Sequence, residues 1–298
     1  MVHDWKRVFP DADHRWVMGL RPADVASFFA PTDRHTAVLR ERAQWLADEA
    51  EKYAMLTPAA HSALDETIEL ARSLGATIDS GSASSTGRFA SLLDLGRTWE
   101  SDFVWMHPDD NGVPSLVGGV VCFPSSWALA DKLGKPMRAI HDPVPGLDDA
   151  LGHQIDIFLT KLQPGAAWTR KNWSLERDDE LNHHPSRLGK SFARNPEPRD
   201  LWIRLEHQLL FKLPRSGSTL FAIRIELVPL PDILAEPDVA ARLGRIFKTM
   251  NPAAAAYKRV TPQLVALLIN AAEPSPMRYG KTDFRLSQDA EPLSKPPT

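Results

Sequence analysis

The amino-acid sequence predicts an α+β fold in which helices lie before and after an antiparallel sheet. The main observation is two alternating segments within residues 201–230, joined by a short loop at residues 213–218 that contains Pro214 and Gly217. Alternation of apolar and polar residues with a period of two is typical of a half-buried antiparallel hairpin. Apolar residues at helical spacing lie on both sides of it, which favours α+β over a doubly wound sheet.

Each hairpin segment has one apolar face, and in the first segment His207 interrupts it. The apolar residues of the two faces are Leu201, Ile203, Leu205, Leu209 and Phe211, then Phe221, Ile223, Ile225 and Leu227. We expect Arg204, Glu206, Arg224 and Glu226 to share the other face. They make either cross-strand ion pairs on a solvated surface or the polar wall of a cavity, where Glu206 could receive a cationic amine.

The other elements follow from periodicity and turn residues, taken in chain order. The first thirty residues, interrupted by prolines, are expected to be irregular. Helices are expected at 33–53, 58–74, 127–133, 147–162, 239–250 and 261–272, a short element at 89–95, and strands at 99–106, 116–123 and 167–173. Residues 79–87 and 163–200 are expected to be mostly loop. Gly118 and Gly119 would weaken their strand and often mark the close approach of another backbone or a ligand.

Composition narrows the class of protein. The chain has 298 residues and a net charge of -3, which gives no electrostatic reason to expect a nucleic-acid or anionic-membrane partner. No segment is long and apolar enough to span a membrane, and the N-terminus lacks the apolar core of a signal peptide, so we expect a cytoplasmic protein. The single cysteine, Cys122, excludes intrachain disulfides and cysteine-cluster metal sites.

The common catalytic motifs are absent, so the histidines are the main candidates for metal ligands or acid–base groups. His141 lies in a turn bracketed by prolines and is either a structural histidine or a metal ligand or acid–base group held rigidly. His207 is either a satisfied buried histidine or an imidazole that holds a haem iron. The pair His183-His184 is expected to be solvated, as is His153. Cys122 is expected to be a buried structural thiol, with a haem thiolate as the lesser alternative.

Several strings in order resemble the haem-dependent oxidative N-demethylase family. They are VCFPSSW at 121–127, KLGKPMRAIHDPVPG at 132–146, RKNWSL at 170–175 and RLEHQLLFKLPRSGSTLFAIRIELVPL at 204–230. An MGL at 18–20 and the TWESDFVWM segment also fit the family's order of elements, so the resemblance spans residues 15–272.

The resemblance implies a single PAS-like domain over residues 1–272 that binds haem b, followed by a proline-rich, partly disordered tail at 273–298. Characterised relatives oxidise small methylated amines with O2 and release formaldehyde and the demethylated amine. Separate flavin or iron–sulfur reductase subunits deliver the electrons. The expected partners are therefore an amine, O2 and reductase subunits.

The resemblance also assigns candidate residues. His141 becomes the first candidate for the iron ligand, with His207 second, and Glu206 is the catalytic residue that would orient the amine. Arg204 could clamp a haem propionate, as could Arg215, Ser216 and Gly217 of the hairpin loop. Trp127, Trp173 and Phe123 could line the pocket or belong to the core. His207 stands where the family string is expected to have an arginine, which questions whether the relatives' pocket is kept.

Two other functions stay open from the sequence. One is a non-catalytic haem-binding or ligand-sensing PAS-like protein, and the other is a divergent member that has lost haem and serves as a structural partner. A Soret band separates haem binders from the last of these, and amine-dependent oxygen consumption separates an enzyme from a sensor.

Overall fold

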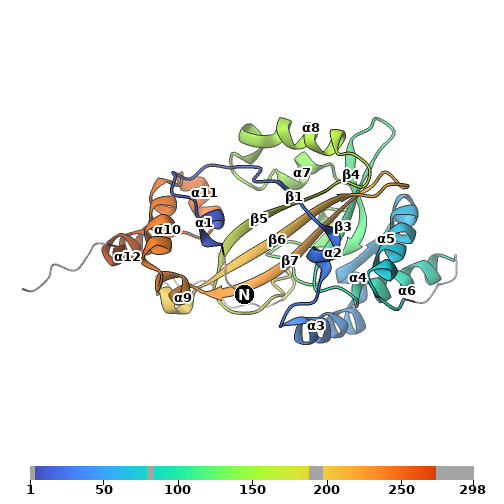
Figure 1. Ribbon diagram of the computed structural model, residues 1–298, viewed down its shortest axis with the longest axis horizontal. Helices are drawn as coiled ribbons and strands as arrows, with labels where there is room; N and C mark the ends of the chain where they lie inside the picture. The colour runs from blue at the N-terminus through green and yellow to red at the C-terminus, as the bar shows by residue number, and fades with distance from the viewer. Residues whose placement is uncertain (1–3, 79–83, 188–196, 273–298) are drawn as a thin grey trace, which may run out of the picture.

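The computed structural model describes residues 4–78, 84–187 and 197–272, and within them one antiparallel sheet organises the chain (Figure 1). The strand order is β1-β5-β6-β7-β3-β4-β2. The strands are β1 (Arg21–Pro22), β2 (Ala54–Leu56), β3 (Asp102–Pro108), β4 (Pro114–Val120), β5 (Ala167–Glu176), β6 (Trp202–Lys212) and β7 (Thr219–Pro229). The predicted α+β class is confirmed. The PAS-like comparison and the single domain over residues 1–272 stay predictions.

The β6–β7 hairpin is the centre of the sheet, and its loop occupies residues 213–218 as predicted. The six-residue loop pairs Lys212 with Thr219, so each even-numbered residue of β6 lies opposite an odd-numbered residue of β7. Opposite residues in a sheet share a face. Arg204 and Glu206 therefore share a face with Leu227 and Ile225, whereas Arg224 and Glu226 lie on the other face with His207. The prediction that the four charged residues share one face was wrong.

Two faces of the sheet follow from this register. We call the one that carries Arg204, Glu206 and Gln208 the even face, and the one that carries Leu205, His207 and Leu209 the odd face. On the odd face, Leu209 packs in a core with α3 (His35–Asp48), α5 (His61–Ser73) and α6 (Ser85–Gly96). These helices lie together beside α4 (Ala50–Tyr53) on the right of Figure 1.

The even face is covered at one end by α7 (Met137–His141) and α8 (His153–Lys161). A π-helical turn, Asp148–Gly152, leads into α8, and the predicted apolar stripe of Leu147, Leu151, Ile155 and Leu159 packs on Leu210 of β6. Figure 1 shows α7 and α8 together above the sheet. The stripe is thus confirmed, although the helix begins with a π-helical turn.

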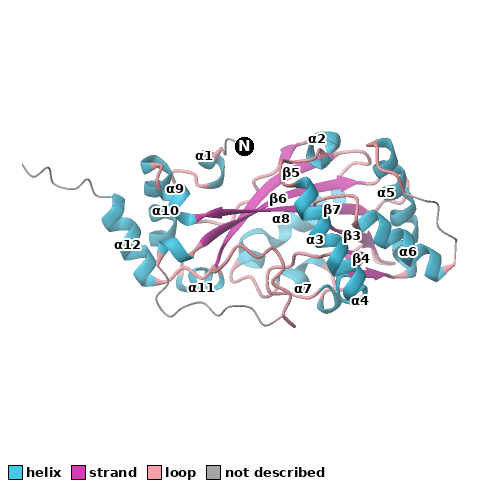
Figure 2. Cartoon of the chain, turned by 90° about the horizontal axis from the view of Figure 1, so that it is seen from below, coloured by secondary structure: helices cyan, strands magenta, loops and turns pink. Residues whose placement is uncertain are grey.

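The far end of the odd face has a second apolar cluster. Leu205 and Ile203 pack there against α1 (Trp5–Val8), α10 (Pro237–Thr249) and α12 (Pro262–Ala272). The short helices α9 (Leu230–Leu234) and α11 (Pro252–Tyr257) complete this end. Figure 2 shows α9 to α12 gathered at one end of the sheet, away from α3 to α6. The two predicted C-terminal helices are confirmed.

Several local predictions need correction. The first thirty residues hold α1, β1 and α2 (Val25–Phe29), because their apolar residues pack on the two cores. Residues 127–133 form only a short 3-10 turn, Leu129–Asp131, without a serine cap. β5 extends to Glu176 and β4 ends at Val120. The short element at 89–95 is part of α6, and Ser84, in the predicted loop, caps it.

The two glycines of β4 behave as predicted. A Cβ at Gly118 would lie 2.8 Å from the carbonyl oxygen of Met55, and one at Gly119 would lie 2.2 Å from that of Phe103. Neighbouring backbone therefore occupies the space that a side chain would need. The predicted tail at 273–298 lies outside the described residues. None of the helices in the described ranges is long and apolar enough to cross a membrane.

Candidate functional site

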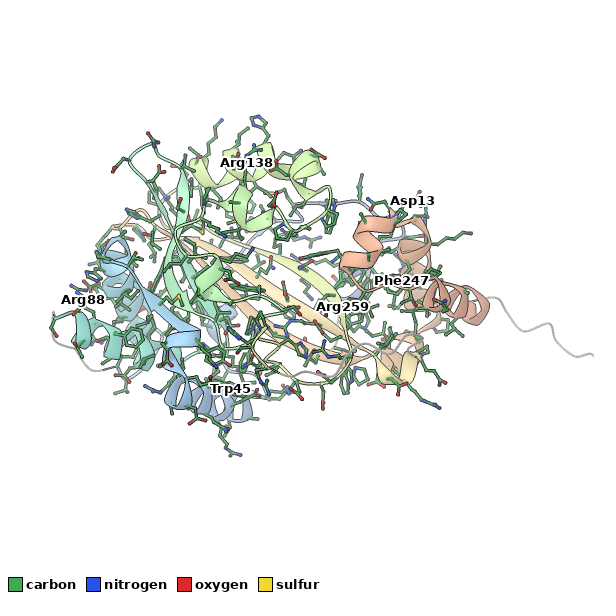
Figure 3. The ribbon with its side chains drawn as sticks, turned by 180° about the vertical axis from the view of Figure 1, so that it is seen from behind. Asp13, Trp45, Arg88, Arg138, Phe247 and Arg259 are labelled. Atoms are coloured by element: carbon green, nitrogen blue, oxygen red, sulfur yellow. The ribbon has the colours of Figure 1, made fainter. Side chains whose placement is uncertain are left out.

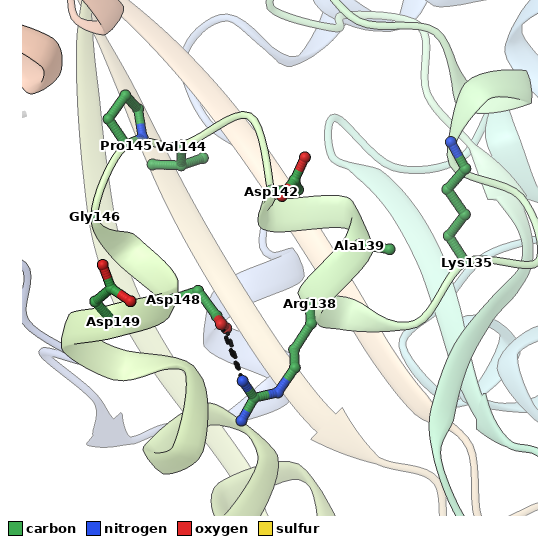
Figure 4. Close-up of a pocket in the computed structure, with 9 residues that line it drawn as sticks. All are labelled: Lys135, Arg138, Ala139, Asp142, Val144, Pro145, Gly146, Asp148 and Asp149. Carbon is green, nitrogen blue, oxygen red and sulfur yellow. Dashed lines mark hydrogen bonds and ion pairs between the residues drawn. The ribbon is translucent and has the colours of Figure 1, made fainter.

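His141 is the last residue of α7, a short helix rather than the expected rigid turn. Arg138, on the preceding turn, fastens α7 by ion pairs to Asp148 (3.0 Å) and to Asp156 of α8 (2.7 Å). Figure 4 shows the first of these pairs beside a pocket that His141 does not line. The two ion pairs fix the position of α7, and with it the position of His141.

The His141 imidazole is neutral at physiological pH. Burial lowers its pKa to about 4, and the positive charges of Arg170 and Lys132 add to this effect against Asp148. Among the described residues, none makes a hydrogen bond to the ring. A neutral imidazole with a free nitrogen is the form in which histidine binds a metal. His141 therefore has the protonation state of a ligand.

The middle of the even face carries a carboxylate held by amides. Glu206 Oε2 accepts hydrogen bonds from Gln208 Nε2 (2.8 Å) and from Asn172 Nδ2 (3.1 Å) of β5. Glu206 Oε1 lies 3.8 Å from Arg204 Nε, beyond hydrogen-bonding distance. The register that pairs Asn172 with Glu206 brings these groups together. One carboxylate oxygen is thus fixed by the protein, and the other accepts no hydrogen bond from the described residues.

Arg170 lies on β5 directly opposite Gln208, so it shares the even face with Glu206. Its Nε is buried and has no hydrogen-bond partner among the described residues. Burial lowers the pKa of the guanidinium, and the Glu206 charge opposes this. The charge of Arg170 also lowers the pKa values of His141 and Lys258. The charge of Arg170 therefore acts both on His141 at the end of α7 and on Lys258 after α11.

Lys258 follows α11 and is 4% exposed. Its Nζ donates to the carbonyl oxygen of Trp173 (2.5 Å) and lies 3.5 Å from Asn172 Oδ1. The ammonium also lies near the rings of Trp173 and Trp16, at 4.3 and 5.4 Å from their centroids. Burial lowers its pKa to about 8, with the Glu206 charge opposing and that of Arg170 adding.

Trp16 links the two sides of the site. Its Nε1 donates to the carbonyl oxygen of Pro145 in the turn after α7 (3.1 Å), while its ring faces the Lys258 ammonium. The N-terminal segment therefore spans the site from His141 to α11. This contact connects elements more than one hundred residues apart in the chain.

Arg259 fastens the segment after α11 to the rest of the protein. It donates to Glu176 Oε2 (2.6 Å) and to Ser126 Oγ (2.8 Å), and both Arg259 and Ser126 have positive φ angles, 63° and 62°. Figure 3 shows Arg259 in the middle of the molecule, between the sheet and the C-terminal helices. A non-glycine residue in this region is held by its contacts. Arg259 thus fixes where its neighbours Tyr257 and Lys258 lie.

The predicted solvation of His183 and His184 was wrong. His183 is 5% exposed, and its Nε2 lies 2.7 Å from Asp178 Oδ1 while Nδ1 lies 3.4 Å from Glu176 Oε2. His184 is buried against the Tyr53 ring. A polar loop sequence does not reveal that its side chains fold inward. His153 is exposed, as predicted.

Arg204 and His207 both have partners within the protein. Arg204 is 1% exposed and donates to the carbonyl oxygens of Leu181 (3.0 Å) and Phe123, so its guanidinium is already engaged by the protein. His207 is on the odd face, where its Nε2 lies 3.0 Å from Glu226 Oε2. The sheet therefore separates His207 from Glu206.

Arg215 and Ser216 belong to the β6–β7 loop, which docks on α5. Their backbone N–H groups donate to the Glu66 carboxylate (2.9 and 2.8 Å), and the Arg215 side chain pairs with Glu69. These hydrogen bonds lower the pKa of Glu66 against the effect of burial. The charge of Arg215 is therefore already paired within the protein, with Glu69 of α5.

The predicted aromatic and thiol residues divide between the core and the site. Trp127 is half-buried and packs with Ile140, next to His141. Phe123 and Trp173 lie in the two cores of the sheet. Cys122 is fully buried, and burial raises its pKa to about 12. This thiol stays protonated, as the prediction of a structural cysteine requires.

Sequence reasoning missed Arg170 and Lys258 as site residues. Arg170 was in a string that resembled a known family, and that was the only signal available. Lys258 directly follows the short helix α11, and its contact with β5 depends on tertiary structure alone.

The chain matches a known protein-family model. The family model described as haem-dependent oxidative N-demethylase, alpha subunit-like, matches residues 74–267. This span includes His141, Arg170, Glu206 and Lys258 and covers more than half of the chain. The groups around His141 fit a haem: a neutral imidazole can bind iron, and the partly exposed Arg170 guanidinium, whose Nε is buried without a partner among the described residues, suits the cofactor's acidic edge.

Proposed function

Because the chain belongs to the family of haem-dependent oxidative N-demethylase alpha subunit-like proteins, we propose that it is the haem-binding subunit of a monooxygenase. In this proposal it removes an N-methyl group from a small amine as formaldehyde. The observation that carries the proposal is the His141 imidazole, neutral and without a hydrogen bond to the described residues, on the side of the sheet that holds Glu206. His141 would bind the iron of haem b.

The bound haem supplies the activation of dioxygen and the oxidation of the N-methyl carbon. Overall, one O2, two electrons and two protons convert the N-methyl amine to formaldehyde, the demethylated amine and water. The protein's own residues bind the amine, orient it and limit its access to water. Arg170, Asn172 and Glu206 on the even face suit this role, because they are polar and only partly exposed.

Glu206 is the residue that we propose to orient the amine. A small methylated amine is a cation at neutral pH, and a carboxylate is its natural acceptor. Asn172 and Gln208 fix Oε2, which leaves Oε1 for the substrate. Lys258 lies within 3.5 Å of Asn172 Oδ1 and so helps to present the amide N–H₂ to Glu206. Preorganised groups of this kind reduce the cost of positioning a substrate.

The electrons are proposed to come from a separate flavin or iron–sulfur reductase subunit. An iron–sulfur cluster is normally held by four cysteine thiolates. This chain has one cysteine, and that thiol is fully buried. The word "subunit" in the family description supports a partner that carries the electrons.

The first test is the visible spectrum of the protein with haem, for wild type and for His141→Ala, His141→Gly and His207→Ala. We expect a Soret band in the wild type that is lost or strongly shifted in both His141 variants. Added imidazole should restore it in His141→Gly, because the free ring replaces the missing ligand. His207→Ala is the matched control and should keep the wild-type band, since His207 is on the opposite face.

Other outcomes are equally informative. A His141→Ala spectrum identical to the wild type would show that another residue binds the iron, and a wild type without a Soret band would remove the proposed function. Amine-dependent oxygen uptake with a surrogate reductant then tests the reaction itself, and Glu206→Gln should raise the KM for the amine. Haem uptake without amine-dependent oxygen uptake would indicate a haem protein that is not a demethylase.

A further inference from the structure

Arg170 is a charged group of the even face whose place the described contacts leave unexplained. Its Nε is buried without a hydrogen-bond partner, and its guanidinium forms no ion pair with any described carboxylate. The residue as a whole is partly exposed, but a buried guanidinium nitrogen without a hydrogen-bond partner calls for an explanation. The nearest acidic influence is Glu206, whose Oε2 is already held by two amides.

The charge balance around Arg170 is positive. Two cations, Arg170 and Lys258, influence one another across the even face, and one carboxylate, Glu206, acts on both. On the His141 side, Lys132 and Asp148 act with opposite signs. The charge of Arg204 is opposed by Glu176 and Asp102 as well as by Glu206, so Arg204 is left out of this balance. The site therefore has room for at least one more negative charge before it is neutral.

The Lys258 ammonium does not share the isolation of Arg170. It donates to the Trp173 carbonyl oxygen and faces two indole rings. The Arg204 guanidinium likewise donates to two backbone carbonyl oxygens. Arg170 has neither kind of partner among the described residues. Arg170 is thus the cation with which an added anion could form an ion pair.

We propose that Arg170 is the receptor for a carboxylate that enters the site from outside the chain. A guanidinium matches a carboxylate with two parallel N–H···O bonds, which a lysine cannot do. The inference rests on the proposed function, which offers two sources of that group. One is a propionate of the haem, and the other is a carboxylate on the methylated amine, as in an N-methyl amino acid. In the second case Glu206 and Arg170 would hold the two ends of a zwitterion.

The experiment compares Arg170→Gln and Arg170→Lys with wild type in two titrations. In the first, the apoprotein takes up haem b or haem dimethyl ester, whose propionates are blocked. In the second, N-methylglycine or N-methylethylamine is added to the haem-loaded protein, and binding is measured from the shift of the Soret band. These two amines share the same C–N–C–C skeleton, and the last carbon is a carboxylate in N-methylglycine but a methyl group in N-methylethylamine.

A propionate at Arg170 predicts that wild type binds haem b more tightly than the ester, by roughly 30-fold, and that Arg170→Gln loses this preference. A substrate carboxylate predicts instead a similar preference for N-methylglycine over N-methylethylamine, again lost in Arg170→Gln, while haem affinity is unchanged. Arg170→Lys should keep part of whichever preference exists, because the charge stays and the fork is lost. If both preferences survive in Arg170→Gln, or neither exists in wild type, the proposal is overturned.

The matched control is Lys171→Gln. It removes one positive charge from the next position of the same strand, on the odd face. Both preferences should survive this change, and their loss would show that general charge, not Arg170, decides them. If wild type takes up no haem, the proposed function fails on its own. Calorimetric titration of that apoprotein with N-methylglycine still tests Arg170, and absence of an Arg170-dependent signal overturns the inference.

Discussion

The two faces of the sheet treat buried charge differently at the same level of β5, β6 and β7. On the odd face, His207, Lys171, Arg224 and Glu226 lie together, with His207 bonded to Glu226 (3.0 Å) and Arg224 bonded to the Phe28 carbonyl oxygen (2.8 Å). On the even face, the Arg170 Nε and the His141 ring have no hydrogen-bond partners among the described residues. Among these groups, His207 and Arg224 on the odd face have hydrogen-bond partners, whereas the His141 ring and the Arg170 Nε on the even face do not, within the described part of the chain.

This difference indicates that the even face carries polar groups whose missing partners lower the stability of the fold. Folding alone favours groups that are paired or solvated, as on the odd face. Polar groups left incomplete in a buried place are typical of sites that receive a ligand. The odd-face cluster is therefore a structural connection between two apolar cores, and the even-face group is the candidate site.

The largest expected effect contrasts two arginines on the even face, Arg204 and Arg170. Arg204→Met should lower the free energy of unfolding by about 3–5 kcal/mol, because two buried carbonyl oxygens, those of Leu181 and Phe123, lose their donors. Arg170→Met should change it by less than about 1 kcal/mol or raise it, since the lost guanidinium has a buried, unpartnered nitrogen. Urea denaturation of the haem-free proteins measures both values.

The comparison fails if the two variants lose similar stability. In that case Arg170 would be a structural residue whose partners the described contacts do not include. Arg204→Lys provides a control for charge, because lysine keeps the charge but cannot reach both carbonyl oxygens with one planar group. It should fall between wild type and Arg204→Met.

Much of the fold could be predicted because the patterns were local. The hairpin and the stripe of Leu147, Leu151, Ile155 and Leu159 are visible at periods of two and about 3.6 residues. The face of Arg224 and Glu226 was predicted wrongly, because it depends on which residues pair across the loop. A change of one residue in that register moves every side chain to the other face.

The candidate site could be predicted only in part, because tertiary contacts assemble it. His141 and Glu206 were named from strings that resemble a family, and the structure places both on the side of the even face. Lys258 gave no local signal: an alanine-rich helix with a lysine after it usually lies in solvent. Its burial follows from the contact of α11 with β5, which no pattern within residues 252–258 encodes.

The next effect in size is a pH dependence that belongs to Lys258. The unfolded chain keeps this proton up to a pH of about 10.5, whereas burial lowers the pKa of Lys258 in the folded protein to about 8. Between these values the unfolded state holds more protons, so stability rises with pH. Relative to Lys258→Met, wild type should gain about 2 kcal/mol in the free energy of unfolding between pH 7.5 and 9.5.

Lys171→Met is the control for this measurement. Burial also lowers the pKa of Lys171, and the charges of Arg7 and Arg224 add to this effect while those of Glu226 and Asp4 oppose it. The residue is only half-buried, however, whereas Lys258 is 4% exposed. Its variant should therefore track the pH dependence of wild type more closely than Lys258→Met does. A Lys258→Met protein with an unchanged pH dependence would mean that Lys258 stays fully charged in the folded state.

The smallest expected effect concerns His207→Arg, which places at this position the residue expected in the family string. The new guanidinium can still pair with Glu226, although Lys171 and Arg224 already bring positive charge to the cluster. We expect a loss of less than about 1 kcal/mol in the free energy of unfolding, as is usual for partly exposed ion pairs. The Soret band should match that of wild type, because the sheet lies between position 207 and the candidate site. A shift comparable with that of His141→Ala would instead mean that the odd-face cluster contacts the haem, and the division of the two faces into a structural and a functional side would have to be abandoned.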